Sequence, residues 1–215
     1  MFDRQFAKPS GLFGKIAGRL MARRDADDHW VVELLELSPD DRVLDVGCGP
    51  GVALELMLPH LSSGLAAGVD PSEVMLLQAA GRNKAAVRAG KLELRLGDAG
   101  HLPFPDVHFS KACAIHSVYF WQPLDRGLRE LHRVLQPGGR LVLAVRARRT
   151  DVPWLSPSRR GYGDDQVAAL EHALEPAGFA GVHTQRRDIG SETIVAVSAE
   201  ALKGRGNSAW EEPVA

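Results

Sequence analysis

The stretch Val43-Leu-Asp-Val-Gly-Cys-Gly-Pro-Gly51 is a short apolar run that leads directly into three alternating glycines. A segment with helical periodicity, VALELMLPHL (52–61), follows it. An apolar strand, a glycine turn and a helix in this order are typical of an α/β sheet, in which such turns lie at the carboxyl edge and bind ligands. Because glycine has no Cβ, we expect a ligand to approach the backbone N–H groups of this turn closely.

The rest of the chain continues this alternation of strands and helices. After the first strand at 43–46, further strands are expected at 65–70, 91–96, 111–117, 140–146, 183–189 and 193–198. Helices are also expected at 12–24, 26–37, 72–89, 124–135 and 164–177, and Pro137-Gly-Gly139 is expected to end the helix at 124–135. Helical crossovers between strands predict an α/β fold, with a mostly parallel sheet, helices on both faces and an antiparallel addition at the end.

Composition limits the class of protein. The chain has 215 residues, of which 45% are hydrophobic and 25% charged, and its formal net charge is −1. These values are typical of one soluble globular domain rather than a disordered, fibrous or membrane protein. Two cysteines, Cys48 and Cys113, are too few for a disulfide framework or a four-cysteine metal site. No apolar run approaches the ~18 residues of a membrane span, so we expect a cytoplasmic protein without stable membrane attachment.

Charge is distributed unevenly along the chain. Residues 1–24 are rich in Lys and Arg and have a weak amphipathic helical pattern, and a second basic block spans 140–160. Such blocks suit an acidic substrate, a nucleic acid or a lipid head group, but short blocks without interleaved aromatic residues are more typical of solvated faces. The predicted organisation is a basic N-terminal segment at 1–24 that can act as a lid, a domain at 25–199 and a flexible tail at 200–215.

Three acidic residues lie where strands approach the expected ligand edge. Asp45 lies inside the first strand, where a buried carboxylate needs donors and a bound amine would supply one. Asp70 ends the second strand, where it can accept hydrogen bonds from ribose hydroxyls or start the next helix. Asp98 follows the third strand and can contact an adenine edge or serve as a turn residue. The G-x-G-x-G spacing differs from the G-x-G-x-x-G of nicotinamide dehydrogenases, which disfavours that class.

Four motifs resemble, in order, those of the class I S-adenosylmethionine-dependent methyltransferases, and the domain resembles the methyltransferase type 11 domain. The motifs are VLDVGCGPG (43–51), GVDPS (68–72), GDAGHLPFPDVHFS (97–110) and LHRVLQPGGRLVLA (131–144). The resemblance covers about residues 30–198. It implies a Rossmann-like sheet of seven strands, the last of them antiparallel. Two features depart from the family: Ser110 stands where an acid is common, and the region after the fifth strand is short, which leaves the substrate open.

The resemblance also implies a cofactor site for S-adenosylmethionine and its product S-adenosylhomocysteine. The glycines of the first motif would approach the methionyl portion, Asp45 would orient the loop and the amine, Asp70 would bind the ribose, and Asp98 with the Ala99 amide would bind adenine. His116, at the end of the fourth strand, would lie beside the reacting methyl. The implied cofactor-binding residues are Asp45, Gly47, Cys48, Gly49, Gly51, Asp70, Pro71, Asp98, Ala99 and His116.

His116 and Tyr119 are the candidate catalytic residues. His116 can be a general base, an orienting donor or a wall residue, and the sequence leaves these alternatives open. Tyr119, Phe120 and Trp121 can form an aromatic wall that attracts a sulfonium, or pack in the core. Cys48 suits a small filler better than a nucleophile. The remaining histidines are scattered, so no metal site is expected.

The expected function is therefore transfer of a methyl group from S-adenosylmethionine to an oxygen, nitrogen or carbon atom of a small-molecule acceptor. In-line displacement from a sulfonium needs alignment, a dry site and at most one base. The alternatives are a methyltransferase for RNA or protein, and a subunit that binds the cofactor without turnover. Nucleic acid is not the favoured partner, since the length leaves no room for a recognition module. The acceptor and the oligomeric state are not predicted.

Overall fold

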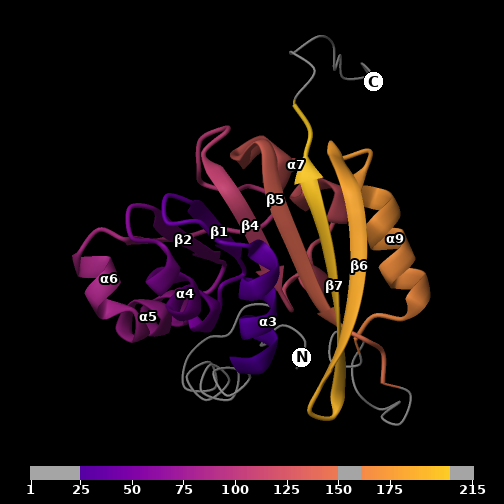
Figure 1. Cartoon of the computed structure of the whole chain (residues 1–215), viewed down its shortest axis with the longest axis horizontal. Helices are drawn as coiled ribbons and strands as arrows, with labels where there is room; N and C mark the ends of the chain where they lie inside the picture. Colours follow the sequence, from indigo (N-terminus) through magenta and orange to yellow (C-terminus); the bar gives the residue numbers. More distant parts are fainter. Residues whose placement is uncertain (1–24, 150–160, 204–215) are drawn as a thin grey trace.

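The computed structural model describes residues 25–149 and 161–203. The segments 1–24, 150–160 and 204–215 lie outside the described residues, and with them lie the expected N-terminal segment and most of the expected tail. The described part forms a seven-stranded sheet with helices on both faces (Figure 1).

The helices and strands follow the expected alternation. The strands are β1 (Arg42–Val46), β2 (Leu65–Asp70), β3 (Leu92–Leu96), β4 (Phe109–Ile115), β5 (Leu135–Arg146), β6 (Phe179–Ile189) and β7 (Glu192–Ala201). The helices are α3 (Asp25–Leu35), α4 (Val52–Met57), α5 (Glu73–Arg82), α6 (Lys84–Arg88), α7 (Leu124–Val134) and α9 (Asp164–Leu174), with short 3₁₀ turns η1 (Leu58–His60) and η2 (Val118–Phe120).

The strand order is β3-β2-β1-β4-β5-β7-β6. Strands β1 to β5 pair in parallel, whereas β7 runs antiparallel to both β5 and β6. The prediction of a mostly parallel, Rossmann-like sheet with an antiparallel last strand is thus confirmed. The chain reverses its direction of travel across the sheet between β1 and β4, the position at which open α/β sheets bind ligands.

Two hydrophobic clusters cover the two faces of the sheet. One contains buried residues of α3 and α4, among them Val31, Leu35 and Leu54. The other contains buried residues of α7 and α9, among them Leu128 and Leu170. In Figure 1, β1 and β2 with α4 to α6 lie on one side of the view, β6 and β7 with α9 lie on the other, and β4 and β5 lie between them. The central strands, and the ligand edge that they form, are therefore fixed by packing from both sides.

The observed elements differ from the predicted ones in detail at several places. The helix expected at 72–89 is two helices, because the Asn83 amide donates to Gly51 O at 3.0 Å and Ala79 O at 3.1 Å and breaks the helix there. Pro137-Gly-Gly139 does not end α7. That helix stops at Val134, and the three residues lie inside β5, in a bulge that follows the pairing of Leu135 with Phe109. Strand β7 extends to Ala201, beyond the expected end of the domain at 199.

Within residues 25–149 and 161–203, no helix is long and apolar enough to cross a membrane. The expected cytoplasmic location stays a prediction.

Candidate functional site

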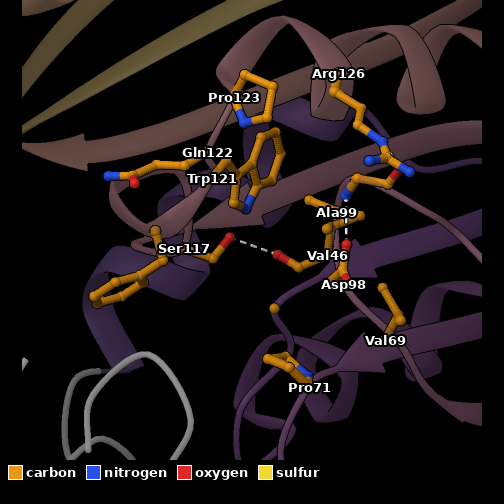
Figure 2. A pocket seen from close by; sticks show the side chains of 14 residues that line it. Val46, Val69, Pro71, Asp98, Ala99, Ser117, Trp121, Gln122, Pro123 and Arg126 are labelled. Atoms are coloured by element: carbon orange, nitrogen blue, oxygen red, sulfur yellow. Dashed lines mark hydrogen bonds between the residues drawn. The ribbon is translucent and has the colours of Figure 1, made fainter. Parts of the chain in front are cut away.

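A cavity of about 410 Å³ opens at the carboxyl ends of β1 and β2. Figure 2 shows Trp121 and Pro71 on opposite sides of it, with Ser117 on one flank and Asp98 and Arg126 on the other. The lining residues are Val46, Gly47, Val69, Pro71, Gly97, Asp98, Ala99, Gly100, Ser117, Phe120, Trp121, Gln122, Pro123 and Arg126. The cavity lies where the strand order reverses, as the sequence predicts for the ligand edge.

The glycine turn after β1 fits closely against its neighbours at one position and faces open space at another. A Cβ on Gly47 would lie 2.4 Å from Ser117 Cβ, whereas a Cβ on Gly49 would meet nothing within 4 Å. Both glycines have positive φ, 78° and 51°, which L side chains rarely adopt. Gly47 therefore allows the end of β1 and Ser117 to approach each other, and Gly49 leaves the space above the turn clear for a ligand.

The backbone N–H groups of this turn already have partners within the protein. The amides of Gly47 and Cys48 donate to Val69 O at 2.7 and 3.1 Å. The amide of Gly49 donates to Asp70 Oδ2 at 2.9 Å. The expectation that these N–H groups are presented to a ligand is wrong for the structure described here, because the end of β2 accepts them. At its glycine positions, the turn presents backbone without side chains to a ligand.

Asp45 and Asp70 are buried carboxylates on neighbouring strands, with 2% and 6% of their surfaces exposed. Burial raises the pKa of Asp45 to about 7, opposed by a hydrogen bond from the Cys113 thiol and assisted by repulsion from Asp70. Burial also raises the pKa of Asp70, although the amides of Ser72 and Gly49 donate to it and lower it. Among the described residues no Lys or Arg forms an ion pair with either acid. This part of the site therefore favours a cation.

Asp98 and Arg126 form the opposite rim. Asp98 Oδ1 accepts the Gly100 N–H at 2.8 Å, and Arg126 Nε donates to Gly100 O at 2.8 Å. Asp98 is thus a turn residue, and it also lines the cavity together with Ala99. Both alternatives that the sequence left open for Asp98 are compatible with this geometry.

The aromatic residues after β4 divide between the cavity and the core. Phe120 and Trp121 line the cavity, and a Cβ on Gly127 of α7 would lie 2.8 Å from Trp121 Cε3, so the absence of a side chain there lets the indole pack closely. Tyr119 packs against the core cluster, and its ring contacts the Tyr162 ring edge to face, with 5.1 Å between the ring centroids. Burial raises the pKa of Tyr119 to about 12, so its phenol is not a base near neutral pH.

His116 follows β4 in a left-handed backbone conformation, with φ of 56°. Its Nε2 lies 2.9 Å from Asp27 Oδ2 on α3, and its Nδ1 lies 3.4 Å from the Tyr119 hydroxyl. The two predicted catalytic residues are therefore in contact with each other. Neither lines the cavity, although their neighbours Ser117 and Phe120 do.

The predicted cofactor residues divide into those that line the cavity and those that do not. Those that line it are Gly47, Pro71, Asp98 and Ala99. Those that do not line it are Asp45, Cys48, Gly49, Gly51, Asp70 and His116. Gly51 precedes α4 and packs against Ala79, and burial raises the pKa of the Cys48 thiol well above its usual range, which favours the filler interpretation.

Sequence reasoning missed several residues of the site. Ser117, whose Oγ donates to Val46 O at 2.6 Å, lines the cavity, as do Gln122, Pro123 and Arg126. Ser117 was predictable from its place at the end of the expected fourth strand, two residues beyond the end of β4. Asp27 carries no local pattern that points to His116, because only the packing of α3 on the sheet brings them together. Among the described residues, no group of three or more His, Cys, Asp or Glu is arranged to hold a metal ion.

The described part of the second basic block is neutralised by acids. Arg140 pairs with Glu36 at 3.0 Å, Arg146 with Glu192 at 2.8 Å, and Arg148 lies 3.8 Å from Asp165. Side chains that face local acids do not present the continuous positive surface that a phosphate backbone requires. The solvated-face interpretation therefore suits this part of the block better.

Comparisons with known proteins agree with this geometry. The family model described as "Methyltransferase domain" matches residues 44–143. "Uncharacterized methyltransferase YdaC" of Bacillus subtilis is 28% identical over 187 residues, which cover 86% of this chain and 97% of that protein. A 2-phytyl-1,4-naphtoquinone methyltransferase of Synechococcus elongatus is 37% identical over 106 residues, 49% of this chain and 46% of that protein.

A solved SAM-dependent methyltransferase from Aquifex aeolicus shares the fold, with a TM-score of 0.67 at 22% identity over 82% of this chain and 90% of that one. The four motifs, the strand order and the matched family model agree. The chain belongs to the class I S-adenosylmethionine-dependent methyltransferases.

Proposed function

We propose that this methyltransferase transfers the methyl group to a small-molecule acceptor, and that S-adenosylmethionine lies in the cavity at the ends of β1 and β2. One observation carries the placement: Asp45 and Asp70 are buried side by side at this edge without a cationic partner among the described residues. S-adenosylmethionine carries a sulfonium and an ammonium group, and a nearby positive charge stabilises ionised carboxylates. An anionic dinucleotide has the opposite sign of charge and would not stabilise the ionised carboxylates in this way.

The residues at the site fit the cofactor in size and chemistry as well. Asp70 has oxygen lone pairs beyond the two that accept the Gly49 and Ser72 amides, and these suit ribose hydroxyls. Asp98 and the Ala99 amide at the opposite rim suit the adenine edge, and the clear space at Gly49 suits the methionyl portion. The cofactor supplies a methyl group on a sulfonium whose leaving group is a neutral thioether. The protein supplies alignment and exclusion of water.

Three features support a small-molecule acceptor. The described basic side chains at 140–148 are paired with acids, so they do not form a surface for nucleic acid. Phe120 and Trp121 give the cavity an aromatic wall, which suits an apolar or aromatic ligand. A relative of this chain is named as a methyltransferase of a naphthoquinone, which is a small molecule.

His116 is proposed as the residue that contacts the acceptor. It sits at the end of the strand next to β1, its backbone is held in a rare conformation, and its neighbour Ser117 lines the cavity. Tyr119 acts through His116 in this proposal, because its own hydroxyl is buried against β5. The proposed lid at residues 1–24 stays a prediction, which limited proteolysis with and without ligand would test.

The experiment that tests the proposal is calorimetric titration followed by a turnover screen. S-adenosylmethionine and S-adenosylhomocysteine are expected to bind, and NAD is not. Methyl-labelled S-adenosylmethionine is then incubated with phenols and hydroquinones, with transfer RNA and with a protein extract as three separate acceptor pools. Label only in RNA or protein would contradict the small-molecule proposal, and binding without label in any pool would favour the non-catalytic subunit.

A further inference from the structure

The first turn of α3 meets the end of β4 through one polar contact. Asp27 Oδ2 lies 2.9 Å from His116 Nε2, although the two residues are 89 positions apart in the chain. Only 8% of the Asp27 side chain and 18% of the His116 side chain are exposed. A buried carboxylate requires hydrogen-bond donors, so the contact is a hydrogen bond from the ring N–H of His116 to Asp27.

The contacts of Tyr119 indicate which ring nitrogen of His116 carries the hydrogen. Its hydroxyl oxygen accepts the Arg146 backbone N–H at 2.5 Å, so its own hydrogen is available for another acceptor. His116 Nδ1, at 3.4 Å, is that acceptor, since Nε2 already faces a carboxylate that can only accept when ionised. The neutral imidazole therefore has its hydrogen on Nε2 and its lone pair on Nδ1.

The backbone adds a further constraint on the ring. His116 has φ of 56°, a region that residues other than glycine rarely adopt, and its N–H donates to Ala144 O at 2.9 Å. Such a conformation persists only where surrounding contacts enforce it, and these positions gather at functional sites. The ring is thus held from α3 on one side and from β5 and Tyr119 on the other.

We propose that Asp27 is a positioning residue that keeps Nδ1 of His116 as the proton-accepting atom, and that the methyl acceptor is consequently a hydroxyl or a carbon acid. This inference rests on the proposed function. The bond from the acceptor atom to the methyl carbon forms while the carbon–sulfur bond breaks, and the bonding pair stays on sulfur. The acceptor's proton passes to Nδ1.

The contacts on the two ring nitrogens have different roles in this step. The 3.4 Å contact between Tyr119 and Nδ1 is long for a hydrogen bond, so an acceptor hydroxyl can replace it. The 2.9 Å contact with Asp27 is retained, and the carboxylate stabilises the imidazolium that forms. An acceptor amine with a free lone pair would not need this arrangement to react.

Proton NMR of the intact protein tests the arrangement without any acceptor. An Nε2–H that is bonded to a carboxylate and shielded from solvent gives its own downfield resonance, assigned by its loss in His116→Asn. The wild type and the matched control Glu33→Gln, an exposed carboxylate on the same helix, are expected to keep it. Asp27→Asn is expected to lose it or move it upfield. An unchanged resonance in Asp27→Asn, or a wild-type ring with its hydrogen on Nδ1, overturns the proposal.

Kinetics test the consequence for the acceptor. With a phenol or hydroquinone, Asp27→Asn is expected to lower kcat by about 10- to 10⁴-fold and to leave KM for S-adenosylmethionine within about twofold, while Asp27→Glu recovers part of kcat. Wild-type kcat in Asp27→Asn, or methylation of amines alone, overturns the proposal. If the wild-type protein does not bind S-adenosylmethionine, the proposed function fails, and the resonance still decides the arrangement of Asp27 and His116.

Discussion

Two regions of the same sheet edge are built in different ways. The region at the ends of β1 and β2 contains a glycine turn and two acids, Asp45 and Asp70, within one continuous stretch of chain. The region after β4 depends on Asp27 of α3, which reaches His116 from 89 positions away. The first region is assembled within one stretch of 26 residues (45–70) and suits a cofactor, while the second is assembled by the packing of α3 on the sheet and suits proton transfer. The comparison predicts that changes in one region affect binding and that changes in the other affect turnover.

The largest effect is expected from the region after β4. His116→Asn should lower kcat by about 10²- to 10⁴-fold if the imidazole removes the acceptor's proton, and asparagine tolerates the left-handed backbone of this position. S-adenosylmethionine affinity from calorimetry should stay near the wild-type value. A variant with wild-type kcat would assign His116 to the wall of the site, and a variant that loses cofactor affinity instead would erase the distinction between the regions.

The next effect is expected at Asp70, in the cofactor region. Asp70→Asn removes a charged acceptor, which should weaken S-adenosylmethionine binding by about 1.5–3 kcal/mol, or roughly 10- to 150-fold. Asp98→Ala should weaken binding less, because the Ala99 amide remains. Urea unfolding of each variant separates lost affinity from lost structure. Affinity within about twofold of the wild type in Asp70→Asn would contradict the ribose assignment.

The glycine turn itself separates packing from ligand access. Gly47→Ala places a Cβ 2.4 Å from Ser117 Cβ, so we expect a loss of about 1–3 kcal/mol in the free energy of unfolding. Gly49→Ala meets no neighbour and should lose less stability while reducing cofactor affinity. Alanine has an unfavourable positive φ at either position, so each variant is the control for the other. Equal stability losses would mean that backbone strain alone explains both.

A further effect concerns pH. The folded protein holds the Asp45 proton up to about pH 7, whereas the unfolded chain releases it near the ordinary pKa of 3.8. Because the unfolded state binds fewer protons in this window, stability from this group falls as the pH rises from about 4 to about 7 and is constant above it. Asp45→Asn should remove that fall in urea unfolding, and the exposed Asp125→Asn should not. A wild-type slope that persists in Asp45→Asn would contradict the burial of an unpaired acid.

The sequence was sufficient for the features that depend on neighbouring residues. The strands, the helical crossovers between them, the glycine turn and the acids at 45, 70 and 98 follow from local patterns, and of the turn and the acids Gly47 and Asp98 line the cavity. Contacts between distant segments were not predictable. Asn83 breaks a continuous helical pattern because it bonds to Gly51 O, 32 positions away, and the glycine-turn amides turn toward β2 because Val69 O and Asp70 accept them. The contact of Asp27 with His116 was not predictable either, because the two residues are 89 positions apart and only the packing of α3 on the sheet brings them together.

The most direct test of the account is a titration of the wild-type protein with S-adenosylmethionine below and above pH 7, in buffers of different ionisation enthalpy. A cationic ligand beside Asp45 and Asp70 favours their ionised forms, so binding should release protons at the lower pH and tighten as the pH rises toward about 7. Asp45→Asn should reduce this release. Binding that takes up protons, or no binding of S-adenosylmethionine together with binding of NAD, would contradict the placement of the cofactor at this edge of the sheet.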